Sequence, residues 1–286
     1  GRKRGIPVVL DLHENFPAAI RSWGFDHGIV GKYFYDLNRW RELERRSVLD
    51  ASGVVVVVEE ALERLVGYGM RNDHSEVVMN AERLTFGEAV TPVDPGADPP
   101  LRLLYIGGLG PHRGITTAIR AVARVAGRIS VHLRLVGDGK VRAELEALTR
   151  ELNVSSHVTF TGWIPLSQVP GEIAASHVGL VPHVRSDHTE TTIPHKLFQC
   201  MTLGRPVLVS DCRPIARIVR ELNCGLVHGS DDDSEMARLI EKLQDPELRR
   251  SLGAAGRSGA QARYNWESEG RRLASFYDRI LKTAGP

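Results

Sequence analysis

The 286-residue sequence predicts an α/β fold with two domains, each built on a parallel sheet. Short runs of apolar and β-branched residues alternate with longer stretches of helical periodicity, as in repeated βα units. Several of the short runs are apolar at every position, which is typical of parallel strands covered by helices on both faces. The length exceeds one typical small domain and suffices for two modest ones.

The order of the expected strands and helices indicates which loops face a ligand. In a parallel sheet with right-handed crossovers, ligands bind at the loops that follow the carboxyl ends of the strands. The expected strands are 8–10, 54–58, 77–79, 101–106, 131–136, 158–160, 178–181, 207–209 and 226–227. The expected helices are 32–49, 60–68, 116–125, 140–152, 167–175, 195–203, 214–222, 233–244 and 266–281.

A linker at 91–100 reads TPVDPGADPP, and its prolines and glycine exclude regular structure there. We therefore expect a first domain at 1–92, a second at 93–265 and a C-terminal helix at 266–286. Only about three strands precede the linker, whereas about six follow it. The chain begins with Gly and reaches a strand pattern almost at once, so we interpret the first domain as incomplete through N-terminal truncation.

Composition excludes several classes of protein. Hydrophobic residues make up 42% and charged residues 25%, with a net charge of +2, which does not favour a nucleic-acid binder. The basic run Arg2–Arg4 favours a solvated terminus over a contact with a membrane surface. No apolar run approaches the roughly 20 residues of a spanning helix, and no secretory signal is visible.

The three cysteines, Cys200, Cys212 and Cys224, lie outside any CxxC pair or histidine cluster. We expect buried thiols rather than a metal site, and a reducing, cytoplasmic setting.

A glycine-rich turn follows the strand at 101–106. Gly107 and Gly108 end the strand, and a helix opens near Gly114. Glycines let a backbone come close to a ligand, the helix start offers free N–H groups to a phosphate, and Arg113 has the geometry to pair with a diphosphate. A tight turn with a solvated arginine explains the glycines equally well.

Two further turns follow the next strands. Gly137 ends one strand, where Asp138 is better explained as a helix cap than as a ligand. Trp163 and Ile164 follow the strand that turns at Gly162, in a position where a base can stack or bond to the backbone. Plain packing of Trp163 is an equal alternative.

The most informative segment reads HTETTIPHKLFQCMTLGRPVLVSD. Pro194 suits a helix start, so the backbone of Thr191, Thr192 and Ile193 lies at the positive end of a helix dipole. Lys196 and Gln199 are three residues apart and share a face of this helix. These positions predict phosphate binding by the helix end and Lys196, and ribose contact by Gln199, in preference to an ordinary capped helix.

At the other end of the chain, VVLDLHENFP places His13 beside an acid at a strand end. A histidine there can act as a base or hold a sugar hydroxyl, although a structural histidine is at least as good an explanation. Pro17 stands where an HExxH motif needs its second histidine, so a zinc protease is not indicated.

Taken together, these segments resemble the retaining GT-B glycosyltransferases of the group 1 (family-four) type, which are related to sucrose synthase and mannosyltransferases. The resemblance spans nearly the whole chain. It rests on the ordered landmarks DLHE, VVMNAER, YIGGLGPHRG, LVGDGK, VTFTGWIP, GLVPH, PHKLFQCMTLGRPVLVSD and YNWE.

The resemblance implies two Rossmann-like domains, of which the second binds a nucleotide sugar and the first receives the C-terminal helix. It implies transfer of a hexosyl group from a UDP- or GDP-sugar with retention, by front-face attack, without metal or cofactor. His13 matches the family position near the transferred sugar and the acceptor. The implied donor contacts come from Gly107, Gly108, Arg113, Gly137, Trp163, Ile164, Thr191, Thr192, Ile193, Lys196, Leu197 and Gln199.

The sequence departs from the family pattern at several positions. Many members have arginine where Gly108 stands, and the two glutamates of the common motif align with Thr191 and Gln199. Glu190 is one residue away from Thr191, so we assign it the first role after a small loop shift. Gln199 can still bond ribose hydroxyls, though more weakly than a carboxylate.

The expected partners are a nucleotide sugar and a glycan, lipid-linked or small-molecule acceptor, with peripheral membrane contact and no nucleic acid. The expected place is the cytoplasm, at the inner face of a membrane. A non-catalytic nucleotide-sugar-binding module, or half of a two-chain enzyme, remains the alternative. The HKLFQCM helix argues against a nucleotide-sugar 2-epimerase, and neither half shows the GxGxxG arrangement of a nicotinamide dehydrogenase.

Overall fold

The computed structural model describes residues 6–23, 25, 35–88, 90, 96 and 98–283. The basic run Arg2–Arg4, the start of the helix expected at 32–49 and the boundary expected between 92 and 93 lie outside these residues.

All nine expected strands are present, in positions close to those expected. The strands are β1 (Val9–Leu12), β2 (Gly53–Val56), β3 (Ser75–Val77), β4 (Leu101–Ile106), β5 (Val131–Val136), β6 (Val158–Gly162), β7 (Val178–Val181), β8 (Val207–Ser210) and β9 (Gly225–His228). The helices are α1 (Phe16–Ser22), α3 (Leu37–Asp50), α4 (Glu59–Val66), α5 (Ile115–Val125), α6 (Arg142–Glu151), α7 (Val169–Ala175), α8 (His195–Thr202), α9 (Arg213–Leu222), α10 (Asp233–Lys242), α11 (Pro246–Ala262) and α12 (Trp266–Thr283).

Helices α1 and α11 were not expected from the sequence. Helix α11 contains Gly253, Gly256 and Gly259, which lower helix propensity and hide its periodicity. The structure explains these glycines by close packing, because a Cβ at Gly253 would lie 2.2 Å from the carbonyl oxygen of Gly204. Packing therefore outweighs propensity in this helix.

The chain forms two compact units. The first unit consists of Gly1–Ala81, Ser186–Ile193 and Trp266–Pro286, and the second of Glu82–Arg185 and Pro194–Asn265. The change from the first unit to the second thus falls at Ala81 and Glu82, eleven residues before the boundary expected at 92. The tail helix α12 belongs to the first unit.

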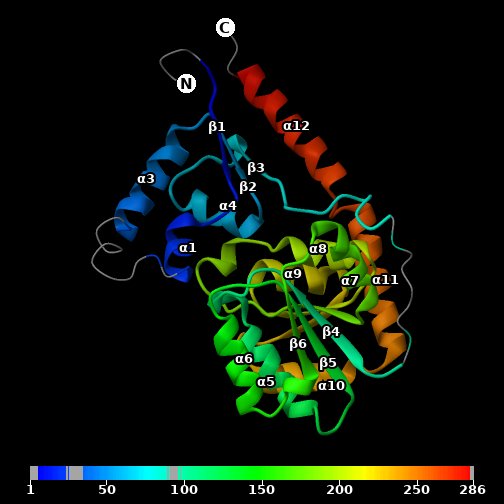
Figure 1. Cartoon of the computed structure of the whole chain (residues 1–286). Helices are drawn as coiled ribbons and strands as arrows, with labels where there is room; N and C mark the ends of the chain where they lie inside the picture. The colour runs from blue at the N-terminus through cyan, green and yellow to red at the C-terminus, as the bar shows by residue number, and fades with distance from the viewer. Residues whose placement is uncertain are drawn as a thin grey trace. The chain divides into compact units, whose positions relative to one another are not determined.

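The first unit is built on a parallel sheet in the order β1-β2-β3. Helix α12 packs on this sheet through Phe276 and Ile280, which share an apolar cluster with Val55 and Val78 (Figure 1). Gly53 permits the contact, because a Cβ there would lie 2.7 Å from Cζ of Phe276. The sheet is therefore closed on this face by the last helix of the chain.

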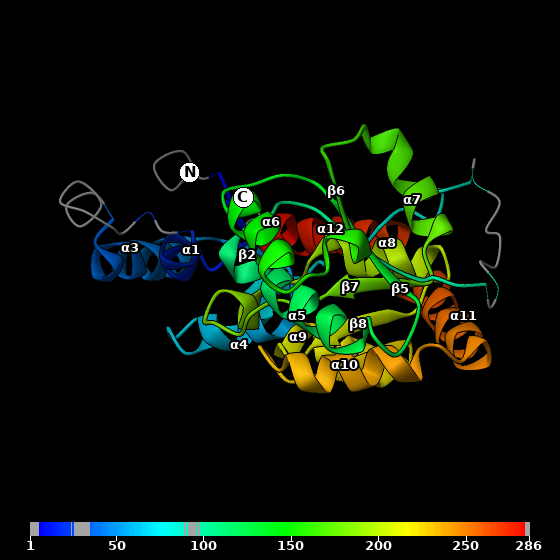
Figure 2. The same cartoon turned by 60° about the horizontal axis from the view of Figure 1, so that its bottom comes forward.

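The second unit is built on six parallel strands in the order β6-β5-β4-β7-β8-β9. Helices α5 and α10 pack against each other and share the main core with alternate residues of β4, whereas α7 contacts β4 and α8 contacts β7 and β8 (Figure 2). The strand order reverses between β4 and β7, as in doubly wound nucleotide-binding folds.

The closure of the first unit by α12 can be tested by truncating Phe276, which is fully buried. We expect Phe276→Ala to lower the free energy of unfolding of this unit by about 3–5 kcal/mol, because it removes a large buried ring and leaves a cavity. Urea denaturation of the two proteins measures the difference. The control is Tyr277→Ala, at a neighbouring side chain that is 43% exposed; equal losses in both variants would contradict this packing.

Candidate functional site

The reversal of strand order in the second unit marks the place where a ligand is expected. In open α/β sheets, ligands bind outside the carboxyl ends of the strands at this switch point. Here it lies beyond Ile106 at the end of β4 and Val181 at the end of β7. Four predicted residues, Gly107, Gly108, Arg113 and Lys196, lie in the turn and the helix start that follow these strands, and Gly137 directly follows the neighbouring strand β5.

Glycines bring the strand ends of the second unit together. Gly107 and Gly137 have φ values of 130° and 135°. A Cβ at Gly137 would lie 2.1 Å from the carbonyl oxygen of Gly107, and the N–H of Gly137 donates to the carbonyl of Gly162 over 2.9 Å. A Cβ at Gly108 would meet only the carbonyl oxygen of Asp138, at 4.0 Å. The turn after β4 is thus open to a ligand at Gly108.

Asp138 is held within this turn region. Its carboxylate accepts the N–H of Gly139 over 2.7 Å and pairs with Arg142 over 2.9 Å. These two interactions lower the pKa of Asp138, the Gly139 bond having the larger effect. Asp138 therefore has structural contacts, but the helix cap expected from the sequence is wrong, because α6 begins after Val141 and has no side-chain cap.

Arg113 is placed by a close contact between the β4 and β7 turns. Gly114 has a φ of 66°, and a Cβ there would lie 1.7 Å from the carbonyl oxygen of Pro182. This approach sets Nη1 of Arg113 3.2 Å from Nε2 of His183. His183 is 1% exposed, so a buried imidazole orients the guanidinium.

Lys196 lies in the first turn of α8 and has unusual surroundings. Its side chain is half-buried, but Nζ is closed to solvent and has no hydrogen-bond partner among the described residues. Nζ lies 3.6 Å from the centre of the Tyr105 ring, and a Cβ at Gly107 would lie 3.1 Å from it. Burial, and then the charge of Arg113, lower the pKa of Lys196 well below its ordinary value. The site therefore holds an amine that lacks a counter-charge.

Tyr105 was not expected as a site residue, because its position in a continuous apolar strand indicates core. Its ring is fully buried, and its hydroxyl donates to the carbonyl of Gly108 over 2.8 Å. The ring is thereby fixed beneath Lys196 as a cation–π partner.

Gln199 is 7% exposed and lies one turn after Lys196. Its Nε2 donates to Oε2 of Glu82 over 3.1 Å, a contact across 117 positions that the sequence did not reveal.

The other predicted residues of the second unit differ in accessibility. Trp163 is 69% exposed, which argues against plain packing and leaves its ring open for stacking, whereas Ile164 is half-buried. Leu197 is fully buried, so its side chain serves the core.

The remaining predicted residues, His13, Glu190 and the stretch 191–193, belong to the first unit. His13 is exposed, with Nε2 3.2 Å from Oδ2 of Asp11, and Glu190 is half-buried in a 3-10 turn. The hydroxyl of Thr191 donates to the carbonyl of Asp187 over 2.9 Å, Thr192 is half-buried, and the Ile193 side chain is 3% exposed.

A histidine that the sequence did not single out holds this segment within the first unit. Nε2 of His188 lies 2.6 Å from Oε2 of Glu14, and Asn15 donates to the carbonyl of Asp187 over 3.2 Å. The motif around His13 is therefore tied to the segment that carries Glu190.

The described residues lack two further features, a metal-binding cluster and a membrane-spanning helix. No group of three or more His, Cys, Asp or Glu residues there is arranged to hold a metal ion. No helix among them is long and apolar enough to cross a membrane. The three cysteines are free and buried, as expected, and burial raises the pKa of Cys200 and Cys224 to about 12.

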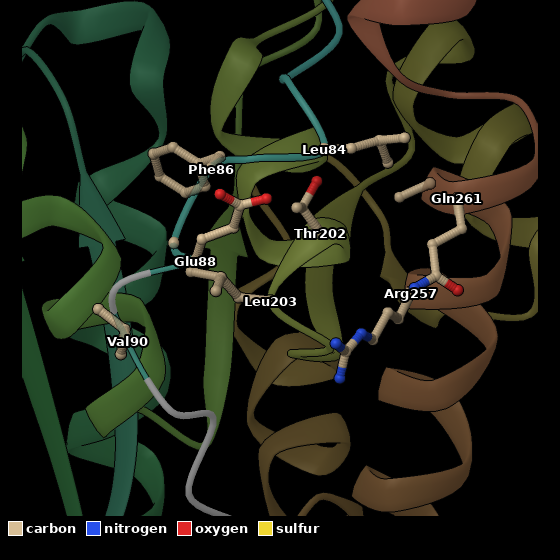
Figure 3. A pocket seen from close by; sticks show the side chains of 10 residues that line it. Leu84, Phe86, Glu88, Val90, Thr202, Leu203, Arg257 and Gln261 are labelled. Carbon is tan, nitrogen blue, oxygen red and sulfur yellow. The ribbon is translucent and has the colours of Figure 1, made fainter.

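The second unit also has a hollow of about 270 Å³ at the other end of α8 (Figure 3). It is lined by Leu84, Phe86, Gly87, Glu88, Val90, Thr202, Leu203, Arg257, Ala260 and Gln261. None of these is a predicted site residue, and the C-terminal end of a helix disfavours an anion. The hollow is therefore separate from the residues predicted to bind the diphosphate.

The six-stranded sheet and its switch point define a doubly wound α/β unit, and basic groups lie at the switch point. Residues 100–245 match the family model described as glycosyl transferases group 1. The chain belongs to this family.

Two curated relatives and one solved structure illustrate the similarity. The chain is 28% identical over 291 residues to an alpha-D-kanosaminyltransferase of Streptomyces kanamyceticus, over 96% of this chain and 71% of the relative. It is 29% identical to a GDP-mannose-dependent monoacylated alpha-(1-6)-phosphatidylinositol monomannoside mannosyltransferase of Corynebacterium glutamicum, over 59% of this chain but only 44% of the relative.

The solved structure is HepE of Anabaena in complex with UDP. It is similar with a TM-score of 0.77 at 17% identity, over 96% of this chain and 72% of HepE. The GT-B fold expected from the sequence is confirmed by such neighbours.

Proposed function

We propose that this chain binds a nucleoside-diphosphate sugar and transfers its hexosyl group with retention of configuration. The observation that carries the proposal is the ammonium of Lys196, which is buried without a hydrogen-bond partner among the described residues, beside Gly107 and a short way from Arg113. A buried charge is costly unless a counter-charge accompanies it. A diphosphate supplies that counter-charge at the expected end of the sheet.

The groups around Lys196 suit a diphosphate in particular. Arg113 offers a planar fork of N–H donors, and Lys196 offers a point charge. The open turn at Gly108 and the free N–H groups at the start of α8 add backbone donors. Two cations and a helix end together stabilise the two charges of a leaving nucleoside diphosphate, so the proposed reaction needs neither metal nor cofactor.

The chemical step that we propose is a front-face displacement. The bond from the anomeric carbon to the diphosphate oxygen breaks, and a bond from the acceptor oxygen forms on the same face. The acceptor proton passes to the leaving phosphate oxygen. In this proposal His13 holds the transferred sugar near the acceptor, and Glu190 takes the role of the first glutamate of the family pattern.

The donor is proposed to be a UDP- or GDP-sugar. The mannosyltransferase relative is named for GDP-mannose, and HepE was solved with UDP. Trp163, which is 69% exposed, offers a face for the base.

The acceptor is proposed to be a glycan, a lipid-linked sugar or a small molecule. The names of the relatives include a phosphatidylinositol monomannoside acceptor, which supports the lipid-linked class. Such an acceptor would bring the enzyme to the cytoplasmic face of a membrane.

The diphosphate assignment is tested by Lys196→Ala and Arg113→Ala. We expect each to weaken binding of UDP or GDP by about 1.5–3 kcal/mol, because each removes a charge-assisted hydrogen bond. Calorimetric titration measures the affinities. Arg120→Ala, which removes an exposed cation from α5, is the control and should bind as the unaltered protein does. Unchanged affinity in both site variants would refute the assignment.

Binding should also depend on pH through Lys196. Its pKa is lowered in the free protein by burial and by Arg113, and a bound diphosphate favours the charged amine and raises this pKa. Between the two pKa values, binding takes up a proton, so affinity falls as pH rises, by up to about tenfold per pH unit. Titrations above pH 7, in buffers of different ionisation enthalpy, measure the uptake. Lys196→Ala should lose it, and equal uptake in this variant would exclude Lys196 as the group.

Retention is tested by the product. With a transferable α-linked donor identified from a panel of nucleotide sugars, the new glycosidic bond should have the α configuration in its proton NMR spectrum. A β product would exclude front-face transfer while leaving nucleotide binding intact.

A further inference from the structure

The carboxylate of Glu82 lies beside Gln199, and both of its oxygens have polar partners within the second unit. Oε2 accepts from Nε2 of Gln199 over 3.1 Å and lies 3.1 Å from Nε2 of His195. Oε1 accepts the N–H of Arg83 over 2.8 Å. The side chain of Glu82 is only 11% exposed. A buried acid therefore contacts α8 at both His195 and Gln199.

The backbone around Glu82 is fixed by contacts at both ends of the segment 82–88. Glu82 pairs with Asn265 in an isolated parallel bridge, and Asn265 itself donates to the carbonyl of Ala260. At the far end, a Cβ at Gly87 would lie 2.5 Å from Cδ2 of Leu203, so the segment lies tightly against the end of α8 (Figure 3). The backbone that carries Glu82 is thus fixed at Asn265 and at the C-terminal end of α8.

This contact determines which way the Gln199 amide faces. An ionised carboxylate only accepts hydrogen bonds, so the NH₂ group must face Glu82 and the carbonyl oxygen must face away. Among the described residues, the hydrogen bond of the Gln199 side chain is made by its Nε2, and its oxygen accepts none. Donation to a charged acceptor also polarises the amide and strengthens its oxygen as an acceptor.

We propose that Glu82 is a positioning residue that presents the Gln199 carbonyl oxygen to a ribose hydroxyl of the nucleotide. The family pattern has a glutamate at the position of Gln199, so Glu82 supplies from another segment the negative charge that this helix lacks. The proposal rests on the nucleotide-binding function proposed above. Glu82 acts through Gln199 and does not itself contact the ligand.

A charge swap tests the proposal. The variants are Glu82→Gln, Gln199→Glu and the double variant, with Glu88→Gln as the control from the same segment, because its acid is exposed. The ligands are UDP or GDP, whichever binds the unaltered protein more tightly, and its 2′-deoxy and 3′-deoxy forms. Calorimetry gives each affinity, and thermal melting reports whether each variant is folded.

We expect the unaltered protein and Glu88→Gln to prefer the ribonucleotide about tenfold over one deoxy form, the scale of one hydrogen bond. Glu82→Gln should bind the ribonucleotide about fivefold more weakly and lose most of this preference. Gln199→Glu alone sets two carboxylates together. It should bind the nucleotide more weakly and melt at a lower temperature. The double variant should regain both the preference and the melting temperature, because the acid and the amide have exchanged places.

The outcomes separate the two proposals. If no nucleoside diphosphate binds the unaltered protein, the proposed function fails. If the nucleotide binds but Glu82→Gln keeps the full ribose preference, the role of Glu82 is overturned. It is overturned equally if the double variant regains its melting temperature without the preference, since Glu82 then serves stability alone.

Discussion

The buried amine of Lys196 is the constraint on which the arrangement of strand ends in the second unit depends. An amine closed to solvent beside an aromatic face is tolerated only where the surroundings are rigid, since relaxation would bring in water or expel the side chain. The bond from the Tyr105 hydroxyl to the carbonyl of Gly108 provides that rigidity beneath it. The geometry around Lys196 is thus fixed without a ligand.

The glycines of the neighbouring turns follow from the same constraint. Backbone atoms leave no room for a Cβ at Gly137 and Gly114, and a Cβ at Gly107 would lie 3.1 Å from Nζ of Lys196. The strand order brings the turn after β4 beside the turn after β7 and so sets the two cations on opposite sides of the switch point. The strand order thus determines which turns are neighbours, and the glycines let these turns approach closely.

The sequence was a good guide to the strands and a poorer guide to what joins them. Runs such as 101–106 and 131–136 are apolar on both faces, and their length and pattern allow little besides a buried strand. Helix α11 was missed because its glycines weaken the helical signal, although tertiary packing requires them.

At the site, local motifs predicted Gly107, Arg113 and Lys196 because a strand end and a helix start are visible in a few consecutive residues. The contact of Glu82 with Gln199 joins segments 117 positions apart, and the burial of Leu197 depends on the packed core. Neither has a local signal in the sequence. Long-range pairing is therefore the part of the site that only the structure reveals.

The tail helix α12 has a consequence for how the protein is made. Strands β1, β2 and β3 precede the second unit in the chain, whereas Phe276 and Ile280, which cover this sheet, follow it, so the ribosome releases the sheet before its cover. Both segments of the second unit, Glu82–Arg185 and Pro194–Asn265, are synthesised in between. All residues of its main core cluster come from these two segments. The apolar face of this sheet therefore stays uncovered while the second unit is translated, which is a period of exposure to aggregation and to chaperones.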